Sequence, residues 1–329
     1  MSSIKDVAQR AGVSLGTVSN VLNSPHRVSK ATLDKVNRAI EELGFVRNDA
    51  ARQLRAGNSR AIGLIVLDAI NPFFADIAKG AEETALGFGF SVLLGNSAGD
   101  PSREARYLEL FEEQRVRGLL ISPFGNVEEK LLKLKNSGIN SVLVDRISKN
   151  NDFSSVSVDD AAGGFMATRH LMDKGRTKIA FVGGPLIIPQ VSDRLAGARK
   201  ALGKKTKEIT VFETAGLSVL EGRKVGMEIA SLPKSKQPDG IFAANDLVAL
   251  GLLQALVVSR GIRVPEDVSI IGYDDIGYSK SAIVPLTSIA QPSEIMGATA
   301  INLLLQASNG QLETQQVVFQ PTLVTRQST

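Results

Sequence analysis

A chain of 329 residues with 43% hydrophobic and 22% charged residues is typical of a soluble globular protein with room for more than one domain. It has no cysteine, so disulfides and thiol chemistry are excluded. The opening MSSIKDVAQR lacks the apolar core of a signal peptide, and no apolar run approaches the ~20 residues that span a bilayer. We therefore expect a cytoplasmic protein without membrane contact.

The positive charge is concentrated at the start of the chain. Residues 1–60 carry ten Lys and Arg against five Asp and Glu, whereas the other 269 residues carry 28 bases and 29 acids. This asymmetry indicates a nucleic acid or another anionic surface as the partner of the first residues. A basic head that contacts only solvent is the alternative interpretation.

Apolar residues at helical spacing predict three short helices within residues 1–46. Their apolar faces are Ile4, Val7, Ala8 and Ala11, then Val18, Val21 and Leu22, and last Leu33, Val36, Ile40 and Leu43. We expect Ser14 and Ser29 to cap the second and third helices, and Gly44 to end the third.

The second of these helices has an outer face of small, uncharged residues within LGTVSNVLN. A helix in the DNA major groove must bring its backbone close to the base edges, and small side chains permit that approach. Ala8 and Gly12 stand where a helix-turn-helix needs a close crossing and a tight turn, with Val7, Val13, Val18 and Val21 as the expected buried set. An ordinary helical bundle is the alternative.

Residues 47–60 separate this head from the rest of the chain. NDAARQLRA could form one or two helical turns, but a helix this short with so thin an apolar stripe is marginal in water. We expect either a hinge helix that folds against a partner or a plain flexible linker.

From residue 61 onward, apolar strand patterns alternate with amphipathic helices. This alternation is typical of parallel sheets covered on both faces, and it occurs twice in tandem. We expect a two-lobed, doubly wound α/β core at 61–329, with lobe 1 at about 61–160 plus 291–320 and lobe 2 at about 161–290 plus the C-terminal tail. Open sheets of this kind bind ligands beyond the carboxyl ends of their strands, so two facing lobes would form a binding cleft.

Flat polar side chains and aromatic rings, which suit sugar hydroxyls and C–H faces, follow several predicted strands. They are Asn71, Phe73, Phe74, Asp145, Arg146, Arg194, Asn245, Asp246, Asp274, Asp275 and Gln291. The two phenylalanines could instead be core residues, and Asp145 with Arg146 could be a structural ion pair. Their recurrence at strand ends of both lobes favours a shared polar site.

IKDVAQRAGVSLGTVSNVLN, followed by a third helix, NDAARQLRAG and a two-lobed core, resembles the LacI/GalR family of bacterial transcriptional regulators. The resemblance covers the whole chain and implies a helix-turn-helix head on a periplasmic-binding-protein-like core. It also implies a repressor that binds palindromic operator DNA as a homodimer or higher assembly, with no cofactor and no metal.

The same resemblance implies roles for residues of the head. In the family the second helix reads operator bases, while hinge helices of two subunits pair in the minor groove and a leucine wedges into the central base step. Leu15, Gly16 and Asn20 match base-reading positions, and Leu54, followed by Arg55, matches the leucine wedge. Phosphate or capping contacts are implied for Ser14, Thr17, Ser19 and Asn23, and a DNA contact for His26 and Arg27.

In the core, the resemblance to ribose repressors and ribose-binding proteins implies a pentose effector, with ribose expected. The matching positions are Asn71, Phe73, Phe74, Asp145, Arg146, Arg194, Asn245, Asp274 and Gln291. A hexose, a nucleoside or a protein co-effector remains an alternative. A purine is less expected because no extra aromatic residue is placed to stack on a base. The pattern leaves open whether effector releases DNA or promotes binding.

Two other classes of protein fit less well. The chain has two histidines and lacks G-x-G-x-x-G after a strand, a P-loop, H-E-x-x-H and a nucleophile elbow, so we do not expect an enzyme. A secreted solute-binding protein would suit the core, but the basic helical head and the missing signal peptide argue against it.

Overall fold

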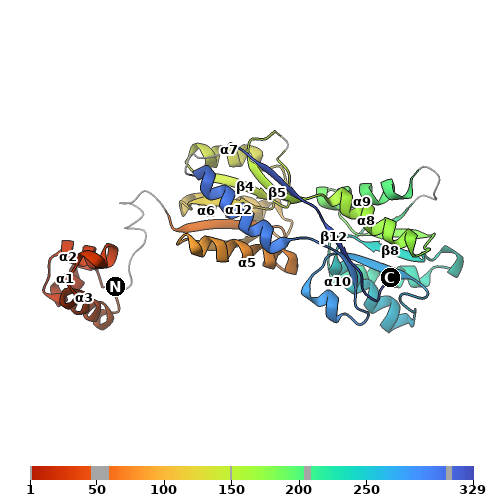
Figure 1. The fold of residues 1–329 in the computed structure, drawn as a ribbon, viewed down its shortest axis with the longest axis horizontal. Helices are drawn as coiled ribbons and strands as arrows, with labels where there is room; N and C mark the ends of the chain where they lie inside the picture. Colours follow the sequence, from red (N-terminus) through yellow and green to blue (C-terminus); the bar gives the residue numbers. More distant parts are fainter. Residues whose placement is uncertain (1, 46–58, 149, 204–208, 309–312) are drawn as a thin grey trace. The chain divides into compact units, whose positions relative to one another are not determined.

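The computed structural model describes residues 2–45, 59–148, 150–203, 209–308 and 313–329, and these form two compact units, Met1–Asn58 and Ser59–Thr329 (Figure 1). The predicted hinge helix, including Leu54 and Arg55, lies outside the described residues except for its last two positions. No helix in the described ranges is long and apolar enough to cross a membrane.

The first unit contains the three predicted helices of the head. They are α1 (Ile4–Ala11), α2 (Leu15–Asn23) and α3 (Lys30–Leu43), with the short 3-10 helix η1 (Pro25–Arg27) between the last two. The hydroxyls of Ser14 and Ser29 accept hydrogen bonds from the backbone N–H groups of Thr17 and Thr32, which confirms the two predicted N-caps. Gly12 ends α1 with φ 60°, a left-handed conformation that glycine adopts without steric cost.

The interior of the head is made of small and β-branched side chains. The buried residues are Val7, Ala8, Ala11, Val18, Val21, Val36 and Ala39, drawn from all three helices. Val13, which was expected to be buried, is only partly so because it lies in the turn between α1 and α2. This packing holds α2 with its small-residue face directed outward.

The second unit contains two six-stranded sheets, each of which defines a lobe. The sheet of lobe 1 has the order β11-β5-β4-β3-β1-β2 and is parallel throughout. Its strands are β1 (Ala61–Val66), β2 (Ser91–Asn96), β3 (Gly118–Ile121), β4 (Asn140–Val144), β5 (Ser154–Val158) and β11 (Gln316–Phe319).

The sheet of lobe 2 has the order β12-β10-β9-β8-β6-β7. Its strands are β6 (Ile179–Val182), β7 (Thr210–Phe212), β8 (Gly240–Ala243), β9 (Ser269–Asp274), β10 (Thr287–Ala290) and β12 (Thr322–Val324). Strand β12 pairs with β10 in the antiparallel direction, so the expectation of parallel sheets holds except at this edge.

Helices cover both faces of each sheet, as the alternating pattern predicted. In lobe 1 they are α5 (Pro72–Gly87), α6 (Pro101–Glu113), α7 (Glu128–Asn136) and α12 (Ser293–Ser308). In lobe 2 they are α8 (Asp160–Asp173), α9 (Pro189–Leu202), α10 (Val219–Ser231) and α11 (Asp246–Leu253), with the short 3-10 helices η2 (Lys234–Lys236) and η4 (Gly277–Ser281). Helix α11 continues as the π-helix η3 (Gln254–Val258).

Successive side chains of a strand enter different cores because they point to opposite faces of the sheet. In β1, Ile62 and Leu64 pack with α5 and α12, whereas Ile65 packs with α6 and α7. In lobe 2, Phe181 packs with α8 and α9, whereas Val182 packs with α10 and α11. Both sheets are therefore doubly wound.

The chain crosses between the lobes three times, after β5, after β10 and after β11 (Figure 1). Helix α8 begins at Asp160 and packs in lobe 2, whereas α12 begins at Ser293 and packs on α5 in lobe 1. The crossing segments bring the carboxyl ends of β5 and β10 to the junction between the lobes.

Helices α8 and α9 cross so closely that each needs a glycine at the contact. A Cβ on Gly164 would stand 1.9 Å from the carbonyl oxygen of Arg194, and one on Gly197 would stand 2.0 Å from that of Ala161. The same reciprocal arrangement joins α5 to α12 through Gly80 and Gly297. The first of these crossings fixes the backbone that carries Arg194.

Candidate DNA-binding face and effector cleft

Helix α2 presents a face that is open to solvent and free of charged side chains. Leu15, Gly16 and Asn20 are exposed, and Leu15 keeps 45% of its surface. A Cβ on Gly16 would meet only the Ser14 hydroxyl, at 3.6 Å, so the backbone there is uncovered. Such a face can approach base edges closely.

Other predicted head residues are partly engaged within the head itself. The Ser14 and Thr17 hydroxyls lie 2.9 Å apart, and the Asn23 amide donates to the Ser19 carbonyl at 2.8 Å. Ser19 is half-buried. His26 and Arg27 are exposed on η1, beside the C-terminal end of α2. The contacts of Ser14 and Asn23 stabilise the two ends of α2.

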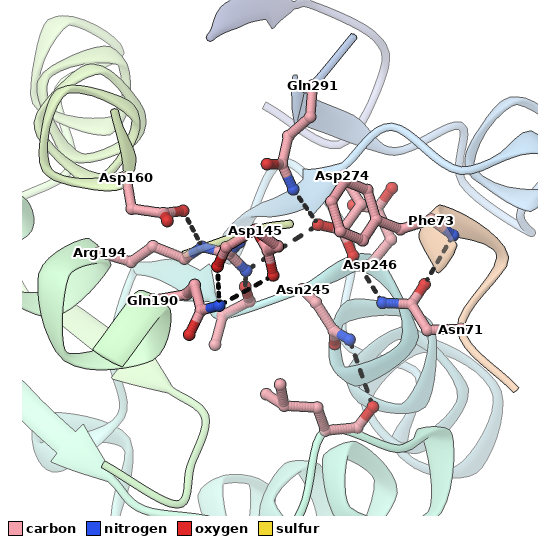
Figure 2. A network of polar contacts seen from close by, with 12 residues as sticks. Asn71, Phe73, Asp145, Asp160, Gln190, Arg194, Asn245, Asp246, Asp274 and Gln291 are labelled. Carbon is pink, nitrogen blue, oxygen red and sulfur yellow. Dashed lines mark hydrogen bonds and ion pairs between the residues drawn. The ribbon is translucent and has the colours of Figure 1, made fainter. Parts of the chain in front are cut away.

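In the core, a polar network spans the junction between the lobes (Figure 2). Asn71 caps the N-terminus of α5 in lobe 1, and its side-chain amide donates to the Asp274 carboxylate of lobe 2 at 2.9 Å. The side-chain amide of Gln291, which follows β10, donates to the other Asp274 oxygen at 2.8 Å. Asp274 therefore accepts hydrogen bonds from both sides of the junction.

A second contact also joins the lobes, with its donor in lobe 2 and its acceptor in lobe 1. Asp145 lies at the end of β4 in lobe 1, and its carboxylate accepts the side-chain amide of Gln190 from α9 of lobe 2 at 2.9 Å. The same amide also donates to the Asp145 backbone carbonyl. The other carboxylate oxygen of Asp145 is buried without a hydrogen-bond partner, as is the side-chain oxygen of Gln291. Unpartnered polar atoms at this depth can serve a ligand that is itself polar.

Arg194 lies at the centre of the network, with only 4% of its surface exposed. Its Nε donates to Asp160 at 2.7 Å, and its Nη1 donates to the Ala244 carbonyl at 2.7 Å. Nη1 also stands 3.9 Å from the Asp274 carboxylate, and the guanidinium lies 3.7 Å from the centre of the Tyr273 ring. This guanidinium is held on several sides and has one edge toward Asp274.

Asn245 reaches the same region from lobe 2 as the N-cap of α11. Its side-chain oxygen accepts the Val248 N–H at 2.9 Å, and its amide donates to the Leu217 carbonyl at 3.3 Å. The residue therefore fixes both the start of α11 and the loop before α10.

The structure does not bring every predicted effector residue into the network. Arg146 is half-buried and donates to the Pro123 carbonyl at 3.4 Å rather than pairing with Asp145. Phe73 and Phe74 pack edge to face, with ring centres 5.0 Å apart, and both belong to the core of lobe 1. Their contact with an effector stays a prediction.

Sequence reasoning missed Gln190, Asp160 and Tyr273 as members of the network. Asp160 stands two positions after the last residue of β5 and satisfies the strand-end rule that identified the others. Gln190 is the second residue of α9, beyond a loop, and Tyr273 lies within strand β9, where a buried aromatic residue is expected to belong to the core. Only Asp160 carried a usable signal in the sequence.

Burial dominates the electrostatics of this region. It raises the pKa of Asp274 to about 6, although the nearby Arg194 guanidinium acts in the opposite direction. Burial, followed by the charge of Asp160, raises the pKa of Asp145 well above its ordinary value. Burial, and then the charge of Asp274, raises the pKa of Asp246, the first residue of α11, to about 7. Burial thus raises the pKa of each of these three carboxyl groups above the ordinary value for aspartate.

Comparison with known proteins places both units. Residues 3–48 match the family model of bacterial regulatory proteins of the lacI family, and residues 168–329 match the periplasmic binding protein-like domain. The HTH-type transcriptional repressor PurR of Aliivibrio fischeri is 35% identical over the whole chain and 98% of its own length. This chain belongs to the LacI family.

Two solved structures extend the likeness. The Lac repressor dimer bound to operator and the anti-inducer ONPF is 29% identical, with a TM-score of 0.85 over 99% of this chain and 98% of that one. A LacI family transcriptional regulator from Enterococcus faecalis V583 with bound ribose is 30% identical, with a TM-score of 0.74 over 82% of this chain and 98% of that one. This LacI-family protein is a DNA-binding regulator and not an enzyme.

The raised pKa values predict how the stability of this LacI-family protein depends on pH. The pKa values of Asp246 and Asp274 in the folded chain, about 7 and about 6, are higher than the ordinary 3.8. Their contribution to the free energy of unfolding is therefore complete below pH ~4 and is lost as the pH rises through these folded-state values. Each group contributes a slope of at most ~1.4 kcal/mol per pH unit. Urea unfolding between pH 5 and pH 8 should show a decline that is smaller in Asp246→Asn.

Comparing the variant with the wild-type protein cancels the titrating groups that do not interact with Asp246. His170, whose pKa is lowered by burial, acts in the opposite direction and is the same in both proteins. Equal slopes for the two proteins between pH 5 and pH 7 would contradict the assignment to Asp246.

Proposed function

We propose that this LacI-family protein is a transcriptional repressor that binds a palindromic operator as a homodimer and is controlled by a pentose, with ribose the expected effector. The observation that carries the proposal is the buried polar network at the junction of the lobes, with Arg194 and Asp274 at its centre. Its amide, carboxylate and guanidinium groups are the side chains that vicinal hydroxyls bind.

Several features favour a sugar over the alternatives. The network has unpartnered acceptor atoms on Asp145 and Gln291, which suit hydroxyl donors. The E. faecalis relative contains bound ribose in its structure.

The proposal for the head follows from the same family membership. The uncharged, exposed face of α2 supports base reading by Asn20, with Leu15 against a thymine methyl group and Gly16 allowing close approach. The related Lac repressor structure contains a dimer bound to operator. For this chain they remain proposals, as do the phosphate contacts of Ser14, Thr17, Ser19 and Asn23 and the DNA contacts of His26, Arg27, Leu54 and Arg55.

Substitution Asn20→Ala should change which operators are bound, because it removes the side chain proposed to hydrogen-bond a base edge. We expect a loss of about 1–3 kcal/mol at the base that Asn20 reads and little change at the others. The measurement is binding to a selected operator and to its single-base variants, at one salt concentration.

Asn23→Ala is the matched control for this experiment. The Asn23 amide is bonded to the Ser19 carbonyl at the end of α2, so its removal should weaken all operators alike. A uniform loss for Asn20→Ala as well would overturn the base-reading role.

Titration calorimetry with ribose tests the effector proposal. Wild-type protein should bind ribose, and Gln291→Ala should lose about 0.5–1.5 kcal/mol of binding energy, because the substitution removes the neutral side chain whose unpartnered oxygen is proposed to accept a sugar hydroxyl. Gln254→Ala, at an exposed position of η3, is the control and should bind normally. Heat from a hexose or a purine base, and none from any pentose, would refute the pentose assignment.

A further inference from the structure

The backbone that carries Asp274 has an uncommon conformation. Asp274 has φ 102° and Asp275 has φ 53°, so two consecutive residues with side chains lie at positive φ. Such positions persist only where surrounding contacts hold them, and they tend to occur at functional sites. The contacts that hold this turn come from residues outside the polar network described above.

The side chain of Asp246 holds the turn at residues 274–276 through hydrogen bonds. It is completely buried, and its Oδ2 accepts the Ile276 N–H at 2.9 Å and the Ser279 hydroxyl at 2.6 Å. Its Oδ1 accepts the Ser288 hydroxyl at 2.6 Å, and the same hydroxyl oxygen accepts the Asp275 N–H at 3.1 Å. Both Asp246 oxygens are thus occupied by groups of the protein.

Gly272 provides the room for this arrangement. A Cβ on Gly272 would stand 2.0 Å from the Asp246 Oδ1, so strand β9 passes directly over the carboxylate. Strand β9 ends two residues later at Asp274. The buried carboxylate and the strand that delivers Asp274 are therefore packed as one piece.

Arg326 holds the turn from the other side, although it is 51 positions away in sequence. Its Nη1 lies 2.6 Å from the Asp275 carboxylate and donates to the Leu286 carbonyl at 2.6 Å. The Arg326 backbone N–H donates to the Thr287 hydroxyl at 2.9 Å. The Asp275 and Arg326 side chains are 17% and 14% exposed, so solvent screens this ion pair only in part.

We propose that Asp246 and Arg326 are positioning residues of the effector site, which hold the Asp274–Ile276 turn so that the Asp274 carboxylate faces Asn71, Gln291 and Arg194. This role rests on the proposed function of Asp274 in effector binding. Neither residue donates to or accepts from the network itself. They act through the turn, with Asp246 bonded to the Ile276 N–H and Arg326 paired with the Asp275 side chain.

The test combines ribose calorimetry with hydrogen exchange of backbone amides. In full-length Arg326→Gln we expect ribose affinity to fall at least tenfold. Exchange should speed up in peptides covering 274–279, and in those covering 71–74, which contact Asp274 across the junction. Exchange in β6 and β8 should not change. Arg326→Lys should recover part of the affinity because it keeps the charge.

Arg263→Gln is the matched control, since Arg263 forms an exposed ion pair with Asp267 in the same lobe, 2.6 Å long. It should leave ribose affinity and exchange at 274–279 unchanged. Ser288→Ala tests the same turn through a smaller change and serves if Arg326→Gln does not fold. It should also loosen 274–279, because the hydroxyl joins Asp246 to the Asp275 N–H.

Two results would overturn the positioning role. One is wild-type ribose affinity in folded Arg326→Gln or Ser288→Ala, and the other is faster exchange throughout lobe 2, which indicates general destabilisation. If wild-type protein binds no ribose, the effector proposal fails, and exchange at 274–279 and 71–74 still decides whether these residues hold the turn.

Discussion

The ion pair between Arg194 and Asp160 is the interaction on which the junction of the lobes depends. Both groups are almost wholly buried, and removing one partner of such a pair typically costs about 3–5 kcal/mol because the other charge is left uncompensated. The pair holds the guanidinium so that its remaining edge faces Asp274, which in turn bonds to Asn71 of the other lobe. The contact between the lobes therefore depends on Arg194, whose charge is compensated within lobe 2 by Asp160.

The fold supplies the rest of the arrangement through backbone geometry. Reciprocal glycines let α8 and α9 cross closely, which places Arg194 beside Asp160. The paired positive φ values at Asp274 and Asp275 aim a carboxylate at the junction and cost on the order of 1–3 kcal/mol each. Buried carboxyls with raised pKa values add to this cost at neutral pH. A site with so many buried polar groups is expected to bind a polar ligand. The free-energy cost of burying these groups is offset by the two apolar cores of each lobe.

Much of this could be predicted from the sequence, because local patterns carry it. Period and capping residues predict the three head helices, and apolar runs predict strands whose ends bear Asn71, Asp145, Asn245 and Asp274. Contacts distant in sequence could not be predicted. Nothing near Gln190 indicates that it bonds to Asp145, and the pairing of Arg326 with Asp275 appears only once β10 and β12 are side by side. The antiparallel direction of the three-residue β12 has no local signal either.

We propose that this protein couples effector binding at the junction of the lobes to operator binding by the head. Thermodynamic linkage requires that ribose change operator affinity by the same factor by which operator changes ribose affinity. The decisive measurement is this pair of affinities, each determined with and without the other ligand at constant salt. The account predicts equal factors of about 5- to 150-fold, the range of ~1–3 kcal/mol of coupling. Ribose binding that leaves operator affinity unchanged would contradict it.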